Sequence, residues 1–340
     1  MKTFSLCMIV KNEEKVLKRC LDSLRGLFEE IIIVDTGSTD STEKIAAEYT
    51  DKIYHFEWID DFAAARNYAM SLATCDYIYM ADADEILDEE NRNKFLILKE
   101  ALVDEIEIVQ MQYANQMDNS TVYNFDCEYR AKLYKRVRNF TFIDPVHEVV
   151  RTEPLVYDSD IVIIHKPEGM HGSRDIRIFE KTIKEKHTLS KRLITMYAKE
   201  LLICATDEQL LNAYDFFIGM ATEPEGYESE DLRIAYIVLA RIALAKDDCE
   251  LLMTYALKEV ASLGSSEVCS ILGSFYEKHG NYNEARLWYY NAAFETQPVL
   301  SVKYKDALPF EGLIRICKRI NEHEEASNYK ALYEARKNNE

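Results

Sequence analysis

The sequence predicts an α/β domain built on a mostly parallel sheet, followed by a domain made only of helices. In the first half, short apolar segments alternate with segments whose apolar residues recur at helical spacing. After residues 166–169 no strand pattern continues, and helical spacing extends almost to the end of the chain. We therefore expect a boundary between residues 170 and 190, and divide the chain into a catalytic domain, 1–175, and a helical domain, 176–340.

The predicted strands of the first half are nearly continuous apolar runs, which are typical of a parallel sheet covered by helices on both faces. We expect the first strands over 4–10, 31–34, 53–56 and 77–80, with helices over 14–27, 45–49 and 62–72. Later strands with a more mixed pattern are expected over 108–113, 121–125, 131–135 and 161–164.

The composition limits the partners and the compartment. The net charge of -19 argues against nucleic acid and against an anionic membrane surface, because both require a basic face. No segment approaches the roughly 20 apolar residues of a membrane span. The eight cysteines are scattered without a Cys-x-x-Cys pair, as is typical of a reducing compartment. We expect a cytoplasmic protein with no membrane span.

Two carboxylates, spaced one residue apart, follow an apolar predicted strand. Asp82 and Asp84 come directly after 77–80, and Asp35 follows 31–34. Ligands of parallel sheets bind beyond the carboxyl ends of the strands, so these acids are expected at one rim. Carboxylate oxygens suit a hard cation such as Mn²⁺ or Mg²⁺, which in turn suits a diphosphate.

Four segments, in this order and spacing, resemble the inverting family 2 glycosyltransferases, which have the GT-A fold. They are residues 8–14, 33–40, 60–69 and 80–85. Asp144-Pro-Val-His147-Glu148 and Ile163-Ile-His165 resemble later landmarks of one branch of that family, which includes lipopolysaccharide-core glucosyltransferases and peptide S-glycosyltransferases that modify glycocins. The resemblance covers residues 4–166, and the branch often carries tetratricopeptide-like helices after the catalytic domain.

The helical half contains a segment that resembles a tetratricopeptide repeat. Small residues at Gly273, Ala285 and Ala292 let two antiparallel helices approach closely, and tyrosines such as Tyr276 and Tyr289 fill the space between them. Repeat arrays need several stacked hairpins, and the length of this half allows them. We expect the domain to recognise the acceptor or to mediate a homodimer.

The resemblance implies a metal-dependent, inverting transfer from a UDP-sugar. The residues it places against the nucleotide-sugar are Val10, Asn12, Glu13, Asp35, Gly37, Ser38, Asp61, Arg66, Asn67, Asp82 and Ala83. Asp35 is expected to accept hydrogen bonds from the base or ribose, or else to cap a turn. Arg66 either reaches the base or the phosphates, or forms a salt bridge. Asp61 either positions Arg66 or caps the helix.

The expected metal ligands for Mn²⁺ or Mg²⁺ are Asp84, Asp82 and His165. Asp84 is the direct ligand, Asp82 contacts the ribose or the metal through water, and His165 is either a third ligand or a structural histidine. Inversion requires a base on the far side of the sugar carbon from the leaving group. Glu148, next to His147, is the expected base; alternatively the two residues brace the acceptor loop.

Three functions compete. We favour transfer to a Ser or Cys side chain of a peptide or protein, because helical repeats present grooves to peptides. The alternative acceptor is a cell-envelope glycan or a lipid-linked saccharide. The third possibility is a tetratricopeptide adaptor with an inactive transferase domain. The intact acidic residues argue against this adaptor.

Overall fold

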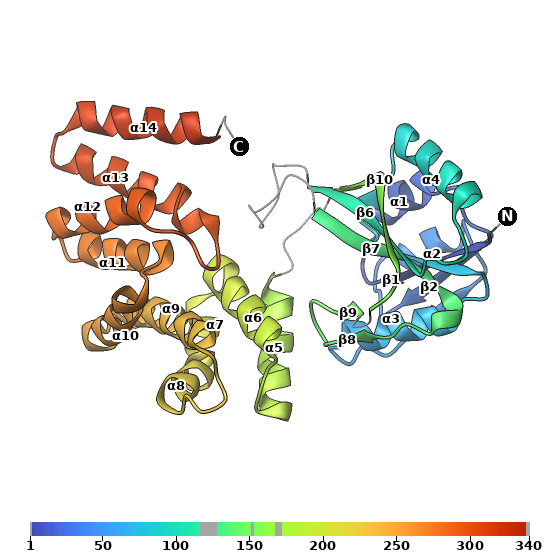
Figure 1. Ribbon diagram of the computed structural model, residues 1–340, viewed down its shortest axis with the longest axis horizontal. Coiled ribbons are helices and arrows are strands. Elements are labelled where there is room, and N and C mark those ends of the chain that lie inside the picture. The colour runs from blue at the N-terminus through green and yellow to red at the C-terminus, as the bar shows by residue number, and fades with distance from the viewer. Residues whose placement is uncertain (1, 116–127, 151–152, 167–171, 338–340) are drawn as a thin grey trace. The chain divides into compact units, whose positions relative to one another are not determined.

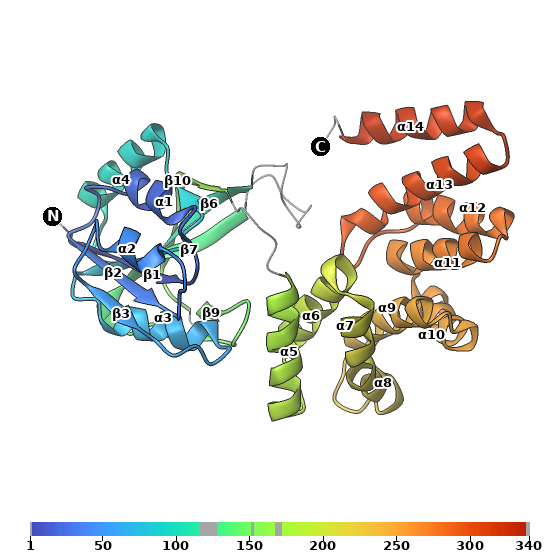
Figure 2. The ribbon, with the colours of Figure 1, turned by 180° about the vertical axis from the view of Figure 1, so that it is seen from behind.

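The computed structural model describes residues 2–115, 128–150, 153–166 and 172–337, which form two compact units (Figures 1 and 2). The second unit begins at Gly172 and the first ends before it. The sequence-based division at residue 175 falls inside the first helix of the second unit, α5 (Gly172–Lys186). Each unit is built around its own apolar core.

The first unit contains a sheet with the strand order β3-β2-β1-β4-β7-β6-β10-β5 among the described residues. Strands β7 and β5 run opposite to the others. The strands span β1 Phe4–Val10, β2 Glu30–Asp35, β3 Ile53–His55, β4 Tyr77–Ala81, β5 Glu85–Ile86, β6 Ile108–Asn115, β7 Glu128–Lys135 and β10 Val156–His165. A separate small ladder joins β8 (Phe142–Ile143) and β9 (Val149–Val150).

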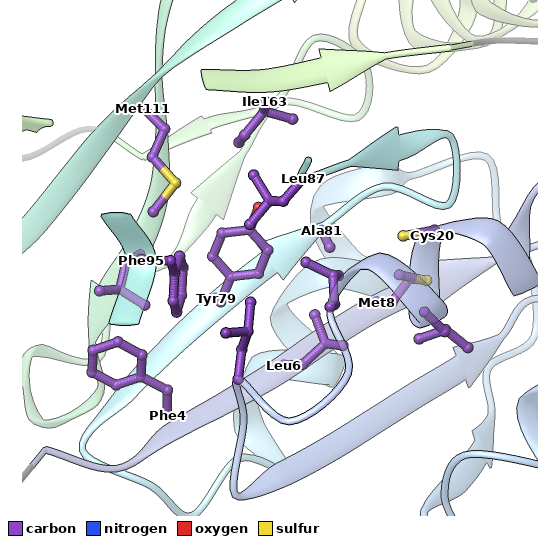
Figure 3. Close-up of a cluster of buried hydrophobic side chains, with 14 of the residues drawn as sticks. Phe4, Leu6, Met8, Cys20, Tyr79, Ala81, Leu87, Phe95, Met111 and Ile163 are labelled. Atoms are coloured by element: carbon purple, nitrogen blue, oxygen red, sulfur yellow. The ribbon is translucent and has the colours of Figure 1, made fainter. Parts of the chain in front are cut away.

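Helices cover both faces of this sheet. They span α1 Leu17–Ser23, α2 Thr42–Ala46, α3 Phe62–Ser71 and α4 Glu89–Ala101. Because successive strand residues point to opposite faces, Leu6 and Met8 of β1 join a core with α1 and α4, whereas Cys7 joins a core with α3. In the first core Tyr79 and Phe95 meet edge to face at 5.6 Å (Figure 3).

The predicted architecture, a mostly parallel mixed sheet followed by helices, is confirmed. Strands β2, β7 and β10 are longer than predicted, α4 and the short strands β5, β8 and β9 were not anticipated, and the predicted strand 121–125 lies outside the described residues. The helix expected over 14–27 is only Leu17–Ser23. Before it, the N–H groups of Val16 and Leu17 donate to the carbonyl of Glu13 in a turn, and the N–H groups of Glu13 and Glu14 donate to Thr42 and Asp40 in the next loop.

The second unit is helical throughout its described residues. After α5 the helices span α6 Lys191–Cys204, α7 Asp207–Asn212, α8 Tyr214–Thr222, α9 Ser229–Lys246, α10 Cys249–Ser262, α11 Ser266–Lys278, α12 Tyr282–Tyr290, α13 Ala307–Arg319 and α14 His323–Lys337. Within the described part of the chain, none of the helices has the length and apolar character needed to cross a membrane. The seven described cysteines are free thiols.

The predicted tetratricopeptide-like hairpin is formed by α11 and α12. The ring of Tyr289, on α12, lies between Gly273 of α11 and Gly312 of α13. A Cβ atom added to Gly273 would lie 2.6 Å from the Tyr289 ring, and one added to Gly312 would lie 2.5 Å from it. Glycine is therefore required at both positions for α11 and α13 to close on this tyrosine.

Candidate active site

Several of the predicted site residues lie at the carboxyl edge of the sheet. Strands β1, β2, β4, β6 and β10 run in the same direction, so their carboxyl ends share that edge. Val10 and Asp35 are paired at the ends of β1 and β2. Asp82 and Asp84 follow β4, and His165 is the last residue of β10. The sheet therefore gathers acidic and imidazole groups from segments far apart in the sequence.

Asp35 shapes the turn that follows β2. Its Oδ1 atom accepts hydrogen bonds from the backbone N–H groups of Gly37 and Ser38, both at 2.8 Å. Gly37 has a φ of 101°, a conformation that favours glycine. Asp35 is buried, and its Oδ2 atom has no hydrogen-bond partner within the described part of the chain. One oxygen of this carboxylate thus builds the turn, and the other is not used by it.

The loop after β1 is fastened to the loop after β2. The backbone N–H of Asn12 donates to Ser38 Oγ at 2.9 Å, and Asn12 Oδ1 accepts from the N–H of Thr39 at 2.8 Å. Asn12 itself adopts a left-handed backbone with a φ of 57°. The N–H of Glu13 donates to Thr42 Oγ1 at 2.7 Å. The two predicted nucleotide-binding segments therefore form one continuous rim.

Arg66, on α3, joins two of the predicted site carboxylates. Its Nε donates to Glu148 Oε1 at 2.5 Å, and its Nη2 donates to Asp82 Oδ1 at 2.7 Å. Burial alone would lower the pKa of Arg66, but the charges of Asp82 and Glu148 raise it above its ordinary value. Burial would likewise raise the pKa of Asp82, but Arg66 and Lys132 hold it well below its usual range. Arg66 and Asp82 are therefore both charged.

Lys132 and Glu85 extend this arrangement, and the sequence analysis missed both. Lys132 Nζ contacts the Glu85 carboxylate and lies 3.6 Å from Asp82 Oδ2. Burial raises the pKa of Glu85 to about 7, with the charge of Asp82 adding to the rise and Lys132 opposing it. These contacts join five residues whose charges alternate in sign from one to the next. We call them the charge chain: Glu148, Arg66, Asp82, Lys132 and Glu85.

The pair formed by Asp84 and His165 fits part of a metal site. His165 Nε2 lies 3.0 Å from Asp84 Oδ2, and both side chains are partly exposed. The two residues offer a carboxylate and an imidazole to a divalent cation. Among the described residues, no three His, Cys, Asp or Glu side chains gather as a ligand set. Asp82 instead contacts Arg66, so a cation here takes its remaining ligands from water or from a bound diphosphate.

The remaining predicted residues support the segment that carries Glu148. Asp61 caps α3, with its Oδ1 accepting from the N–H of Ala64 at 2.9 Å. Asn67 exchanges two hydrogen bonds with the backbone of Phe142, at 2.8 and 2.9 Å. The N–H of Phe62 donates to the carbonyl of Pro145.

The backbone between β8 and Glu148 has an unusual course. Asp144 and His147 have φ values of 73° and 50°, both in the left-handed region. Because this segment is tied to α3, Glu148 is presented to Arg66 on the same helix. Ala83, between the two aspartates that follow β4, is buried.

Part of this chain is similar to known proteins. Residues 5–155 match the family described as glycosyl transferase family 2. A TPR repeat-containing protein of Synechococcus elongatus is 51% identical over 87 residues, which are 26% of this chain and 22% of that protein. The SPbeta prophage-derived glycosyltransferase SunS of Bacillus subtilis is 32% identical over 164 residues, 47% of this chain and 36% of SunS. The chain therefore spans well under half the length of both relatives.

Solved structures were compared as well. A crystal structure of glucosyl-3-phosphoglycerate synthase from Mycobacterium tuberculosis, in complex with Mn²⁺, UDP-glucose and phosphoglyceric acid, aligns with 56% of this chain and 82% of its own. The TM-score is 0.41 and the sequence identity is 13%. The ligands in that complex are those of the mycobacterial enzyme.

Proposed function

The N-terminal unit of this chain belongs to glycosyl transferase family 2, and on that premise we propose that the protein transfers a sugar from a UDP-sugar to a peptide or protein side chain, with inversion. The observation that carries this proposal is the meeting of Asp35, the charge chain and the Asp84–His165 pair at one edge of the sheet. These groups match the base, sugar and diphosphate parts of such a donor.

Asp35 and the rim beside it bind the nucleoside. The Oδ2 atom of Asp35 accepts a hydrogen bond from the base or from the ribose, while Oδ1 keeps its hydrogen bonds from the N–H groups of Gly37 and Ser38. Asn12 and Ser38, already bonded to each other, form the wall against which the base lies. The binding of a nucleoside there satisfies a buried oxygen that would otherwise be costly.

The Asp84–His165 pair holds the cation, Mn²⁺ or Mg²⁺, that the family resemblance implies. When bound, such a cation neutralises part of the charge that grows on the leaving diphosphate. The protein needs that help because its net charge is -19. Asp82 stays with Arg66, so its role is to orient the arginine.

Glu148 acts as the base. As the bond from the acceptor oxygen or sulfur to the sugar carbon forms, the bond from that carbon to the diphosphate oxygen breaks, and the acceptor proton passes to the Glu148 carboxylate. Arg66 orients this carboxylate through its Nε contact at 2.5 Å. The tie between the 144–147 segment and α3 keeps Glu148 in place during the reaction.

The helical unit recognises the acceptor, or joins two copies of the chain as a homodimer. Tetratricopeptide-like hairpins such as α11–α12 present grooves suited to extended or helical peptides. This property favours a Ser or Cys side chain of a peptide over an envelope saccharide. A saccharide acceptor remains the alternative outcome of the test below.

The test combines a donor screen with one substitution. A panel of nucleotide-sugars is screened by thermal shift with and without Mn²⁺, and we expect stabilisation by a UDP-sugar that requires the metal. Glu148→Gln is expected to bind UDP within twofold of the wild type by calorimetry but to lose transfer by at least about 100-fold. Glu100→Gln, on the exposed surface of α4, is the matched control and keeps full transfer.

Two results would overturn the proposal. One is the absence of stabilisation of the wild type by any nucleotide-sugar. The other is transfer by Glu148→Gln at the rate of the control. If the wild type glycosylates saccharides and ignores peptides, the donor chemistry stands and the acceptor assignment is wrong.

A further inference from the structure

We infer that Arg130 binds the diphosphate of the donor and that Tyr113 is the positioning residue that holds its guanidinium in place. This inference rests on the proposed function, because it requires a donor that carries a diphosphate. It adds a phosphate-binding cation that no motif in the sequence indicates.

The register places three side chains on the same face of the sheet. Arg130 of β7 is paired with Met111 of β6, two residues before Tyr113. His165 of β10 is paired with the β6 residue two positions after Tyr113. Because side chains alternate between faces along a strand, Arg130, Tyr113 and His165 all project to the same side. Tyr113 lies on the middle strand of the three.

The ring of Tyr113 touches both neighbours. The Cζ atom of Arg130 lies 3.7 Å from the Tyr113 ring centroid, the spacing of a close cation–π contact. The His165 ring lies 5.2 Å from the same centroid, and His165 Nε2 is 3.0 Å from Asp84. A single buried ring therefore sets the guanidinium beside the residues proposed to hold the metal. A diphosphate bound to that metal meets Arg130 at the same place.

The chemistry of the side chain also favours Arg130 for this role. Arg130 lies near the start of β7, at the same edge of the sheet as His165, and is partly exposed. A guanidinium matches two phosphate oxygens at once, which an ammonium does not. Arg130, held against the Tyr113 ring, is therefore placed to bind a diphosphate at the Asp84–His165 pair.

The test compares UDP with uridine, which lacks the phosphates, at a constant Mn²⁺ concentration. Arg130→Gln is expected to weaken UDP binding by roughly 10- to 100-fold, the effect of hydrogen bonds to a charged group, and to change uridine binding less than twofold. Arg138→Gln is the matched control, because Arg138 follows β7 at its other end and is half exposed. The control is expected to bind both ligands like the wild type.

Substitution of Tyr113 tests the positioning role. Tyr113→Phe keeps the ring and is expected to bind UDP within twofold of the wild type. Tyr113→Leu removes the ring and is expected to weaken UDP as much as Arg130→Gln does, and the double variant is expected to lose no more than either alone. Such non-additivity is the signature of two residues acting as one unit.

The outcomes separate the two proposals. If the wild type binds neither UDP nor any UDP-sugar, the proposed function fails and this inference fails with it. If the wild type binds UDP and Arg130→Gln binds it equally well, only the role of Arg130 is overturned. Equal weakening of UDP and uridine in Arg130→Gln would also overturn it, because the loss would then come from a disturbed fold.

Discussion

Carboxylates are satisfied in different ways in the two units. Glu267, in the first turn of α11, is fully buried and accepts backbone N–H groups from Val299, Leu300 and Ser301 at 2.7–3.0 Å. Asp82, at the edge of the sheet, contacts the side chains of Arg66 and Lys132. Backbone donors are fixed by the fold, whereas long cationic side chains can turn to a ligand. The partners of Asp82 can therefore turn to a ligand, whereas those of Glu267 cannot.

The largest expected effect comes from removing the fixed carboxylate. Glu267→Leu leaves three buried N–H groups without an acceptor, each costing about 1–3 kcal/mol, so we expect a loss of at least about 3 kcal/mol. The measurement is the unfolding of the helical unit in urea. UDP binding is expected to stay unchanged, since Glu267 belongs to the other unit. If Glu267→Leu unfolds at the same urea concentration as the wild type, the backbone hydrogen bonds to Glu267 do not stabilise the helical unit, and the comparison with Asp82 fails.

A smaller effect is expected where the helical unit depends on close packing. Gly312→Ala places a Cβ atom 2.5 Å from the Tyr289 ring, and overpacking of this kind costs about 1–3 kcal/mol. Gly219→Ala is the control, because Gly219 lies within α8 and a Cβ there meets nothing within 4 Å. Alanine is the better helix former, so the control is expected to gain about 0.5–1 kcal/mol. If Gly312→Ala and Gly219→Ala are equally stable, the Tyr289 ring moves aside at little energetic cost.

The smallest effect concerns Glu30, at the opposite edge of the same sheet from Asp82. Burial would raise its pKa, but hydrogen bonds from Lys52, Ser5 and Thr74 lower it to about 2. Because the folded pKa lies below the ordinary value, the contribution of Glu30 to stability is complete above about pH 4.5 and is lost as the pH falls toward 2. We expect a contribution on the order of 1 kcal/mol, since Lys52 is half exposed.

The pH prediction is checked by comparing the unfolding of the wild type and Glu30→Gln between pH 2 and pH 7. The difference between them is expected to be largest at neutral pH and to vanish near pH 2. A constant difference across this range would contradict the assignment. The expected result would show that Glu30 has a structural role in the same unit that contains Asp82.

The parts of the fold that depend on local pattern were predictable. The apolar runs that became β1, β2 and β4, and the acids directly after them, can be read from neighbouring residues. The fold class and the tetratricopeptide-like hairpin followed from such patterns. The hydrogen bonds from Glu13 and Glu14 to the loop after β2 were not predictable, because they join segments far apart in the sequence.

The linkage of the site residues was beyond the reach of the sequence. Arg66 and Glu148 are 82 residues apart, and Lys132 and Glu85 are 47 apart. The first contact depends on the segment before Glu148 being tied to α3. The second depends on β7 lying antiparallel between β4 and β6, a placement that periodicity does not encode. The motif resemblance named the residues it covers, but Lys132, Tyr113 and Arg130 belong to no motif.

The left-handed backbones near the site limit which residues can be substituted at three positions. Asn12, Asp144 and His147 occupy conformations that asparagine, aspartate and glycine tolerate and β-branched residues resist. In a random library, most substitutions at these three positions are expected to destabilise the local backbone. Residues of β7 have extended backbones and carry no such restriction.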